Sequence, residues 1–178
     1  MIAITFGFDI DNTITDTLEK GNEYVNIYNS KYHDYHDLPD DLYNDFFNKY
    51  YLKIISEVNL KEGVINCLTY LRNKGYKIVL ITKRGFINNK LTKEYTLKYL
   101  EDNHVIYDEI VFKSCNKGYD ANKKHVNIFV DDNENYLDSF MDYPKIKVIK
   151  FDKSNNESKY MKIGDWNDLL KYFIKEGY

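Results

Sequence analysis

Short apolar runs alternate along this chain with amphipathic segments of helical length, and this alternation limits the possible folds. The runs that read as buried strands are residues 2–8, 76–82, 109–112, 126–130 and 146–151. Strands that are apolar on both sides are typical of a parallel sheet covered by helices on both faces. The alternation therefore predicts an α/β fold with a largely parallel sheet.

Helices are expected between these strands and after the last one. The amphipathic segments predict helices over 17–32, 41–58, 61–75, 88–103, 117–125 and 165–176. The two helices within residues 17–60 are expected to form a small cap inserted after the first strand, with 1–16 and 61–178 as the core. Residues 151–165 are predicted to be a loop.

Length, charge and cysteine content exclude several classes of protein. The chain has 178 residues, which suits one domain of ordinary size, and its formal charge of -3 gives no electrostatic case for binding nucleic-acid polymers or anionic membranes. Cys67 and Cys115 match neither a disulfide framework nor a metal-site spacing. With no signal peptide and no apolar run of membrane-spanning length, we expect a cytoplasmic protein.

Acidic residues directly follow two of the predicted strands. The stretch "GFDIDNTITD" (7–16) places Asp9 and Asp11 after the first strand, and Asp131 and Asp132 follow the strand at 126–130. In an open α/β sheet, ligands bind beyond the carboxyl ends of the strands, where the strand order reverses. Clustered carboxylates repel one another unless a cation joins them, and Mg²⁺ is the hard cation that oxygen ligands suit. The pattern therefore predicts a magnesium site at this edge.

A hydroxyl and several cations are expected at the same edge. Thr82 ends the strand at 76–82 and is followed by Lys83 and Arg84, while Lys117 comes soon after the strand at 109–112. A carboxylate beside Mg²⁺ and lysine can attack phosphorus, and a second carboxylate with a raised pKa can protonate the leaving oxygen and activate water. Together these groups predict metal-assisted phosphoryl transfer to a small phosphorylated substrate.

Four motifs resemble those of haloacid dehalogenase superfamily phosphatases, and they occur in that family's order. "DIDNT" (9–13) matches the first motif, Asp-x-Asp-x-Thr, and "IVLIT" (78–82) matches the second, an apolar strand that ends in Thr or Ser. Lys117 suits the third motif and "FVDD" (129–132) matches the fourth. The resemblance implies a Rossmann-like core with a parallel sheet and a small helical cap after strand one.

The resemblance also implies roles for the acidic residues. Asp9 would be the nucleophile and a Mg²⁺ ligand. Asp11 would be the general acid and base, and its backbone carbonyl would also bind the metal. Asp131 would ligate Mg²⁺ with support from Asp132, and the motif does not rank these two.

The substrate-binding residues implied by the resemblance are Thr82, Lys83, Arg84 and Lys117. Thr82 would hold the phosphoryl group, and Lys117 would neutralise the charge of aspartate and phosphate. Lys117 is preferred over nearby lysines because it begins the helix that leads into the strand at 126–130. Arg84 has two readings, as a substrate contact or as a cap of its strand.

Residues 80–133 are more narrowly similar to the 5′(3′)-deoxyribonucleotidase-like branch, although Lys83 stands where that branch usually has Ala and Asn12 where Gly is common. This similarity implies a Mg²⁺-dependent nucleotidase acting on nucleoside or deoxynucleoside monophosphates. The alternatives are a phosphatase for a sugar phosphate or another small metabolite and, less favoured, a non-enzymatic phosphorylatable switch. A receiver-type switch keeps its phosphorylated aspartate after a middle strand, unlike the order found here.

Aromatic residues of the expected cap offer two interpretations. They could stack on a base, which would favour a nucleotide substrate, or they could pack against one another at helical spacing, which we favour for most of them. The residues concerned are Tyr24, Tyr28, Phe46, Phe47, Tyr50 and Tyr51.

Overall fold

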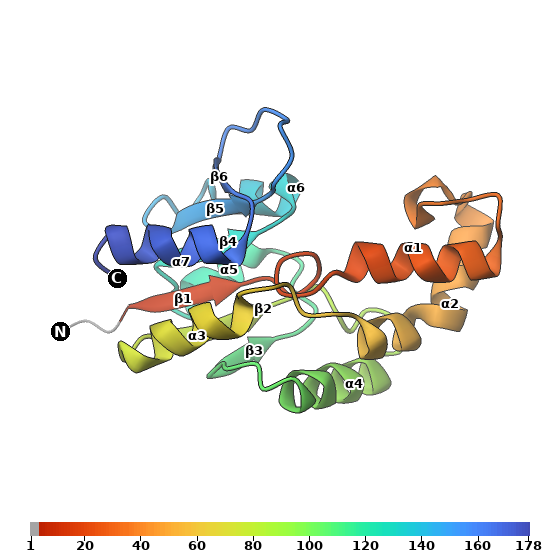
Figure 1. The fold of residues 1–178 in the computed structure, drawn as a ribbon, viewed down its shortest axis with the longest axis horizontal. Coiled ribbons are helices and arrows are strands. Elements are labelled where there is room, and N and C mark those ends of the chain that lie inside the picture. Colours follow the sequence, from red (N-terminus) through yellow and green to blue (C-terminus); the bar gives the residue numbers. More distant parts are fainter. Residues whose placement is uncertain (1–3) are drawn as a thin grey trace.

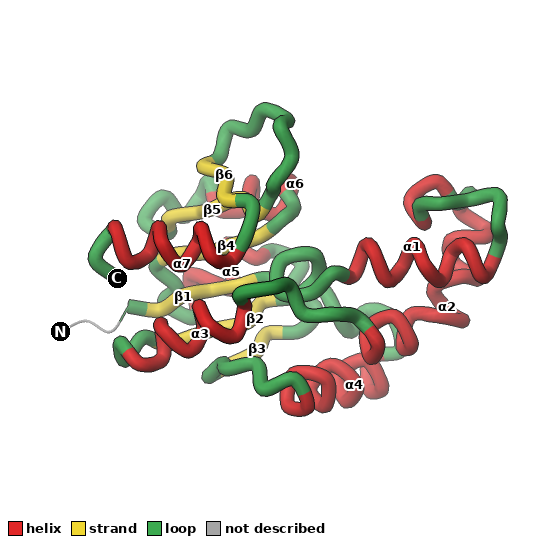
Figure 2. Tube along the Cα trace, in the orientation of Figure 1, coloured by secondary structure: helices red, strands yellow, loops and turns green. Residues whose placement is uncertain are grey.

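The computed structural model describes residues 4–178, which form a six-stranded sheet with helices on both faces (Figures 1 and 2). The strands are β1 (Thr5–Phe8), β2 (Lys77–Ile81), β3 (Glu109–Val111), β4 (Ile128–Asp131), β5 (Lys147–Phe151) and β6 (Met161–Ile163). Their order is β3-β2-β1-β4-β5-β6, and every neighbouring pair is parallel. The predicted α/β fold is therefore confirmed; residues 2 and 3 of the first predicted strand lie outside the described residues.

The predicted helices are present, with small differences at their ends. They are α1 (Thr17–Tyr28), α2 (Asp40–Glu57), α3 (Val64–Asn73), α4 (Asn89–Asp102), α5 (Lys117–Lys123) and α7 (Trp166–Lys175). Helix α1 ends earlier than predicted because Asn29 has an extended backbone. Three short elements were not anticipated, namely η1 (Tyr35–Asp37), α6 (Glu134–Leu137) and η2 (Asp138–Phe140).

Strand β1 shows why its sequence is apolar throughout. Phe6 and Phe8 point to one face of the sheet and pack in the cluster that includes Trp166 of α7. Gly7 points to the other face, where a Cβ atom would lie 2.5 Å from the ring of Phe129. Both faces are thus filled by side chains, and position 7 is a glycine because the Phe129 ring of the neighbouring strand lies directly over it.

The prediction of a loop over residues 151–165 is wrong at its C-terminal end. Met161 to Ile163 form β6, which pairs with β5 at the edge of the sheet. The strand has three residues and none of them is buried. Such a short, exposed edge strand lacks the apolar pattern by which strands are recognised in sequence.

Helices α1 and α2 lie beyond the carboxyl end of β1, and with η1 they form what we call the cap helices (Figure 1). They share an aromatic cluster that includes Tyr24, Tyr28, Phe46, Phe47 and Tyr50. The mutual packing predicted for most of the cap aromatics is therefore confirmed. The division of the chain into a core and a cap at residues 17–60 stays a prediction.

The two connections between the cap helices and the sheet run side by side. Thr15 forms an antiparallel bridge with Leu60, and the Asp16 amide donates a 2.9 Å hydrogen bond to the Asn59 carbonyl. Lys61 also forms an ion pair with Asp16. The two chain segments that lead into and out of the cap helices are thus hydrogen-bonded to each other, and α2 also packs against α4.

The topology creates one switch point in the sheet. From β1 the chain forms β2 and β3 on one side, and then crosses to place β4 on the other side of β1. The carboxyl ends of β1 and β4 flank the crevice where ligands of such sheets bind. Within residues 4–178, no helix combines the length and apolar character needed to cross a bilayer.

Candidate active site

A buried lysine joins two aspartates at the switch point. Asp9 follows β1, and its amide donates a 3.0 Å hydrogen bond to the Val130 carbonyl of β4. The Nζ atom of Lys117 lies 2.7 Å from Oδ1 of Asp9 and 2.7 Å from Oδ2 of Asp131. None of these three side chains is more than 6% exposed, so charges of opposite sign are held together away from water.

Close packing of helix α5 against η2 places Lys117 in this position. The residue after the lysine is Gly118, where a Cβ atom would lie 2.1 Å from the backbone oxygen of Ser139 in η2. Asn116 caps the helix by accepting a hydrogen bond from the Tyr119 amide at 2.8 Å. The structure thus brings together the lysine and the first and fourth motifs, as the sequence predicts.

Three carboxylates are close enough to share a metal ion. Oxygen atoms of Asp9, Asp131 and Asp132 all lie within 4.8 Å of one another. Burial and then the charge of Asp131 raise the pKa of Asp132 to about 7. Burial also raises the pKa of Asp9 well above its usual range, although Lys117 opposes this shift. An all-oxygen donor set with excess negative charge fits Mg²⁺.

The lysine itself remains charged in this cluster. Loss of hydration lowers the pKa of Lys117, but the charges of Asp9 and Asp131 and its hydrogen bonds to them outweigh this and raise it. Lys117 therefore supplies a fixed positive charge beside the Asp9 carboxylate.

Two residues that the sequence analysis did not assign hold the loop after β1 in place. The Thr13 hydroxyl accepts a 3.1 Å hydrogen bond from the Asp132 amide, and the Thr13 carbonyl accepts one of 2.8 Å from Nε1 of Trp166. Asn12 has a φ of 57°, a left-handed conformation that asparagine tolerates. Thr13 belongs to the first motif and was thus detectable, whereas no local pattern indicates Trp166.

Asp11 has a different environment from the other site aspartates. Its Oδ1 atom accepts hydrogen bonds of 2.7 Å from Nη2 of Arg84 and 2.7 Å from the Thr17 hydroxyl, and Nε of Arg84 lies 3.1 Å from both carboxylate oxygens. Burial raises the pKa of Asp11, but Arg84 and Thr17 outweigh this effect and hold the pKa below its usual value. The expected raised pKa for the second carboxylate is therefore not found, because a buried guanidinium faces it.

Thr82 and Lys83 lie at the end of β2. The buried Thr82 hydroxyl accepts a 3.1 Å hydrogen bond from the Arg84 amide. Lys83 is exposed, and its Nζ atom lies 4.8 Å from the ring centroid of Tyr136, the same ring that Nζ of Lys117 approaches at 4.5 Å. Tyr136 thus joins a predicted substrate-binding lysine to the buried cluster, and no motif in the sequence indicated it.

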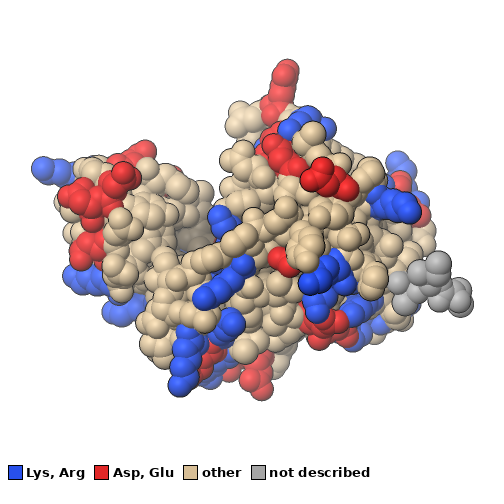
Figure 3. All heavy atoms as spheres, turned by 180° about the vertical axis from the view of Figure 1, so that it is seen from behind, with Lys and Arg blue, Asp and Glu red and all other residues tan. Residues whose placement is uncertain are grey.

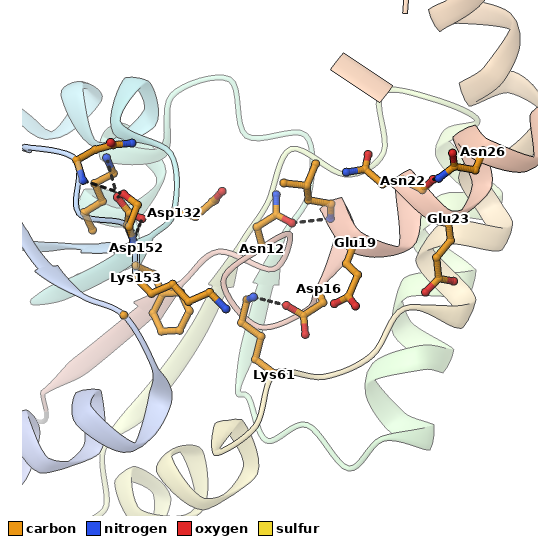
Figure 4. A pocket seen from close by; sticks show the side chains of 16 residues that line it. Asn12, Asp16, Glu19, Asn22, Glu23, Asn26, Lys61, Asp132, Asp152 and Lys153 are labelled. Carbon is orange, nitrogen blue, oxygen red and sulfur yellow. Dashed lines mark hydrogen bonds and ion pairs between the residues drawn. The ribbon is translucent and has the colours of Figure 1, made fainter. Parts of the chain in front are cut away.

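A polar cleft of about 840 Å³ opens beside Asp132 (Figure 4). Glu19 and Asn22 of α1 line one wall, Asp152 and Lys153 line the other, and Asp132 of the carboxylate cluster also lines it. Figure 3 shows the molecule from behind, where a hollow also separates the cap helices from the sheet. A bound molecule in the cleft would lie next to the carboxylate cluster.

No family model and no curated protein matches the sequence. Solved structures do match over nearly the whole chain, at low sequence identity. The "putative beta-phosphoglucomutase" of Thermotoga maritima has a TM-score of 0.70 at 14% identity, over 99% of this chain and 100% of that one.

Two other solved structures are similar over comparable lengths. A "predicted phosphoglycolate phosphatase" from Haemophilus somnus 129pt has a TM-score of 0.62 at 15% identity, covering 96% of this chain and 97% of that one. A HAD-superfamily hydrolase from Ehrlichia chaffeensis has a TM-score of 0.59 at 12% identity, covering 96% of both chains. This chain therefore has the fold of haloacid dehalogenase superfamily hydrolases.

Proposed function

We propose that this protein is a Mg²⁺-dependent phosphomonoesterase that works through an aspartyl-phosphate on Asp9. The observation that carries the proposal is the buried contact of Asp9 with Lys117 at 2.7 Å, with Asp131 and Asp132 within metal-sharing distance at the switch point. The fold shared with hydrolases of the haloacid dehalogenase superfamily supports it.

In the first step, an Asp9 carboxylate oxygen attacks phosphorus while the bond from phosphorus to the leaving oxygen breaks. Asp11, reacting in its protonated form, gives a proton to that oxygen, and the free alcohol departs. Lys117 offsets the charge of Asp9, and Thr82 holds a phosphoryl oxygen. When bound by Asp9, Asp131, Asp132 and the Asp11 backbone carbonyl, Mg²⁺ would supply electrostatic stabilisation of the phosphoryl charge.

In the second step, Asp11 takes a proton from water, and the resulting nucleophile attacks the phosphorus of the Asp9 ester. The bond between Asp9 and phosphorus breaks, which releases inorganic phosphate and restores the Asp9 carboxylate and the protonated Asp11. The cap helices lie over this end of the sheet, where they would limit access of bulk water to the ester (Figure 1).

For the substrate, we favour a sugar phosphate or another small hydroxylated phosphate ester. The cleft beside the site is lined by amides, carboxylates and lysines, groups that hydrogen-bond to hydroxyls, and Phe151 is the aromatic residue among its described lining. Five of the six cap aromatics considered for base stacking pack together instead. The names of the neighbours, a phosphoglucomutase and a phosphoglycolate phosphatase, point in the same direction.

The nucleotide substrate implied by the sequence resemblance has less support. Tyr51 is the one cap aromatic of the six outside that cluster, and its ring centroid lies 6.0 Å from that of Phe47. The cap aromatics therefore pair with one another, which uses the surface that base stacking would need.

A substrate panel tests the proposal. The purified protein is assayed with Mg²⁺ on hexose phosphates, ribose 5-phosphate, phosphoglycolate, nucleoside monophosphates and an aryl phosphate. We expect phosphate release that stops with excess chelator, with the highest kcat/KM on a sugar phosphate. Asp9→Asn should lower kcat by at least about a thousandfold, as expected for loss of a nucleophile.

Two results would contradict parts of the proposal separately. Full activity in chelator, or in Asp9→Asn, would overturn the mechanism. A nucleotide that exceeds every sugar phosphate in kcat/KM would overturn only the substrate class.

A further inference from the structure

Arg84 is the largest charged side chain buried next to the candidate site, and its contacts indicate a role within that site. Its side chain is fully buried, and the guanidinium contacts the Asp11 carboxylate through Nη2 at 2.7 Å and through Nε at 3.1 Å. Nη1 lies 3.3 Å from the Thr96 hydroxyl of α4. The guanidinium is therefore held between α4 and the loop after β1.

The same residue is tied to the phosphoryl-holding position by its backbone. The Arg84 amide donates to the Thr82 hydroxyl at 3.1 Å, and the Arg84 carbonyl accepts a 3.0 Å hydrogen bond from the Lys113 amide. Arg84 thus connects the loops after β1, β2 and β3. A shift of its backbone would move Thr82, and a shift of its side chain would move Asp11.

Arginine is rare in this sequence, so an arginine at position 84 indicates a need for its guanidinium group. Lysine supplies 23 of the 25 basic residues, and arginine occurs only at positions 72 and 84. A guanidinium presents two parallel N–H groups to a carboxylate and fixes its plane, whereas an ammonium is a point charge that does not. The contacts at Asp11 use this fork geometry.

We propose that Arg84 is a positioning residue, which orients the Asp11 carboxylate for proton transfer to the leaving oxygen and does not itself contact the substrate. This inference rests on the proposed phosphatase function. The guanidinium holds Oδ1 and contacts Oδ2 from one side, and Thr17 contacts Oδ1 from the start of the cap helices. Asp11 is thus held at the junction of sheet and cap, with Arg84 as the partner from the sheet side.

The experiment compares leaving groups. Arg84→Lys and wild type are assayed with Mg²⁺ on 4-nitrophenyl phosphate, a good leaving group, and phenyl phosphate, a poor one. Because only the poor leaving group depends strongly on protonation, we expect Arg84→Lys to lower kcat on phenyl phosphate about tenfold more than on 4-nitrophenyl phosphate. KM should change less than about twofold for both, since no substrate contact is lost.

Two further variants complete the design. In an Asp11→Asn background, Arg84→Lys should add no further dependence on the leaving group, because both changes act on the same proton transfer. Arg72→Lys is the matched control, since Arg72 pairs with Asp108 on the surface at 2.8 Å, and it should leave both rates unchanged. Circular dichroism and thermal unfolding show whether each variant is folded.

The possible results distinguish the positioning role of Arg84 from substrate binding and from failure of the proposed function. A rise in KM of equal size for both substrates, with no leaving-group dependence, would mean that Arg84 binds the phosphoryl group and would overturn the inference. If Arg84→Lys does not fold, Thr96→Val is used in its place, because it removes the 3.3 Å contact to Nη1 of Arg84. We then expect the same leaving-group dependence of kcat at a smaller size, and its absence would overturn the inference. No turnover of any aryl phosphate by folded wild-type protein would instead overturn the proposed function.

Discussion

At the scale of single residues, the charges of the carboxylate cluster determine how the site behaves. Asp132 differs from Asp9 and Asp131 because no lysine contacts it directly in the described structure, while both other aspartates share Lys117. Its raised pKa of about 7 reflects burial and the neighbouring negative charge. A divalent cation would relieve this repulsion, and its binding should therefore raise the free energy of unfolding.

We expect Mg²⁺ to raise the melting temperature of the wild-type protein and to have a much smaller effect on Asp132→Asn. Saturation at about a hundred times Kd corresponds to roughly 2.7 kcal/mol of added stability. Asp152→Asn is a suitable control, because Asp152 lines the same cleft but lies outside the cluster. The measurement is thermal unfolding with and without Mg²⁺, and an equal shift in all three proteins would contradict a site that uses Asp132.

At the scale of elements, the placement of α5 depends on a glycine. Gly118→Ala would bring Cβ to within 2.1 Å of a backbone oxygen in η2, so α5 would have to move and would carry Lys117 with it. We expect a loss of about 1–3 kcal/mol in the free energy of unfolding, together with a drop in phosphatase activity. Asn122→Ala on the exposed face of α5 should change neither quantity. Urea unfolding and the aryl phosphate assay check both, and full activity in Gly118→Ala would contradict this account.

The stability of the segment between β5 and β6 depends on pH, because it depends on the charge of Asp152. Burial raises the pKa of Asp152, but hydrogen bonds from Ser154 at 2.8 and 2.9 Å and ion pairs with Lys162 and Lys150 lower it to about 2. A lowered folded-state pKa gives stability that is present above about pH 4, the unfolded value, and is lost as the pH falls toward 2.

Asp152→Asn should therefore be less stable than wild type at pH 7, and the difference should shrink as the pH falls from about 4 to 2. Unfolding in urea at several pH values measures this difference directly. A difference that stays constant down to pH 2 would mean that the Asp152 charge does not contribute.

At the scale of the whole molecule, the two thiols report on the integrity of the core. Cys67 is buried in the cluster between the sheet, α3 and α7, and burial raises its pKa to about 12, while Cys115 is exposed. Because the thiolate is the reactive form, we expect one thiol to react with Ellman's reagent in the native protein and two after unfolding. Rapid reaction of both thiols under native conditions would show that the core opens readily.

The layered fold and the residues gathered at its switch point could be predicted from the amino-acid sequence alone. Continuous apolar strands alternating with helices require a covered parallel sheet. In such a sheet the carboxyl ends of the strands lie at the same edge, independently of the conformations of the loops. Asp9, Lys117, Asp131 and Asp132 were therefore predictable as neighbours from their positions after strands or at the start of a helix. Their catalytic roles, like the cytoplasmic location, stay predictions.

The contacts that hold each group of the site could not be predicted from the sequence, because they depend on the folded conformation of the loops. Asp11 and Arg84 are 73 positions apart, and their pairing depends on the conformations of two loops that no short pattern encodes. The pKa of Asp11 is lowered because of that partner, so the sequence motif that implies a role for Asp11 did not reveal its charge environment. The cap aromatics form the packed cluster that their helical spacing favoured, but which rings meet depends on how the two helices face each other in space.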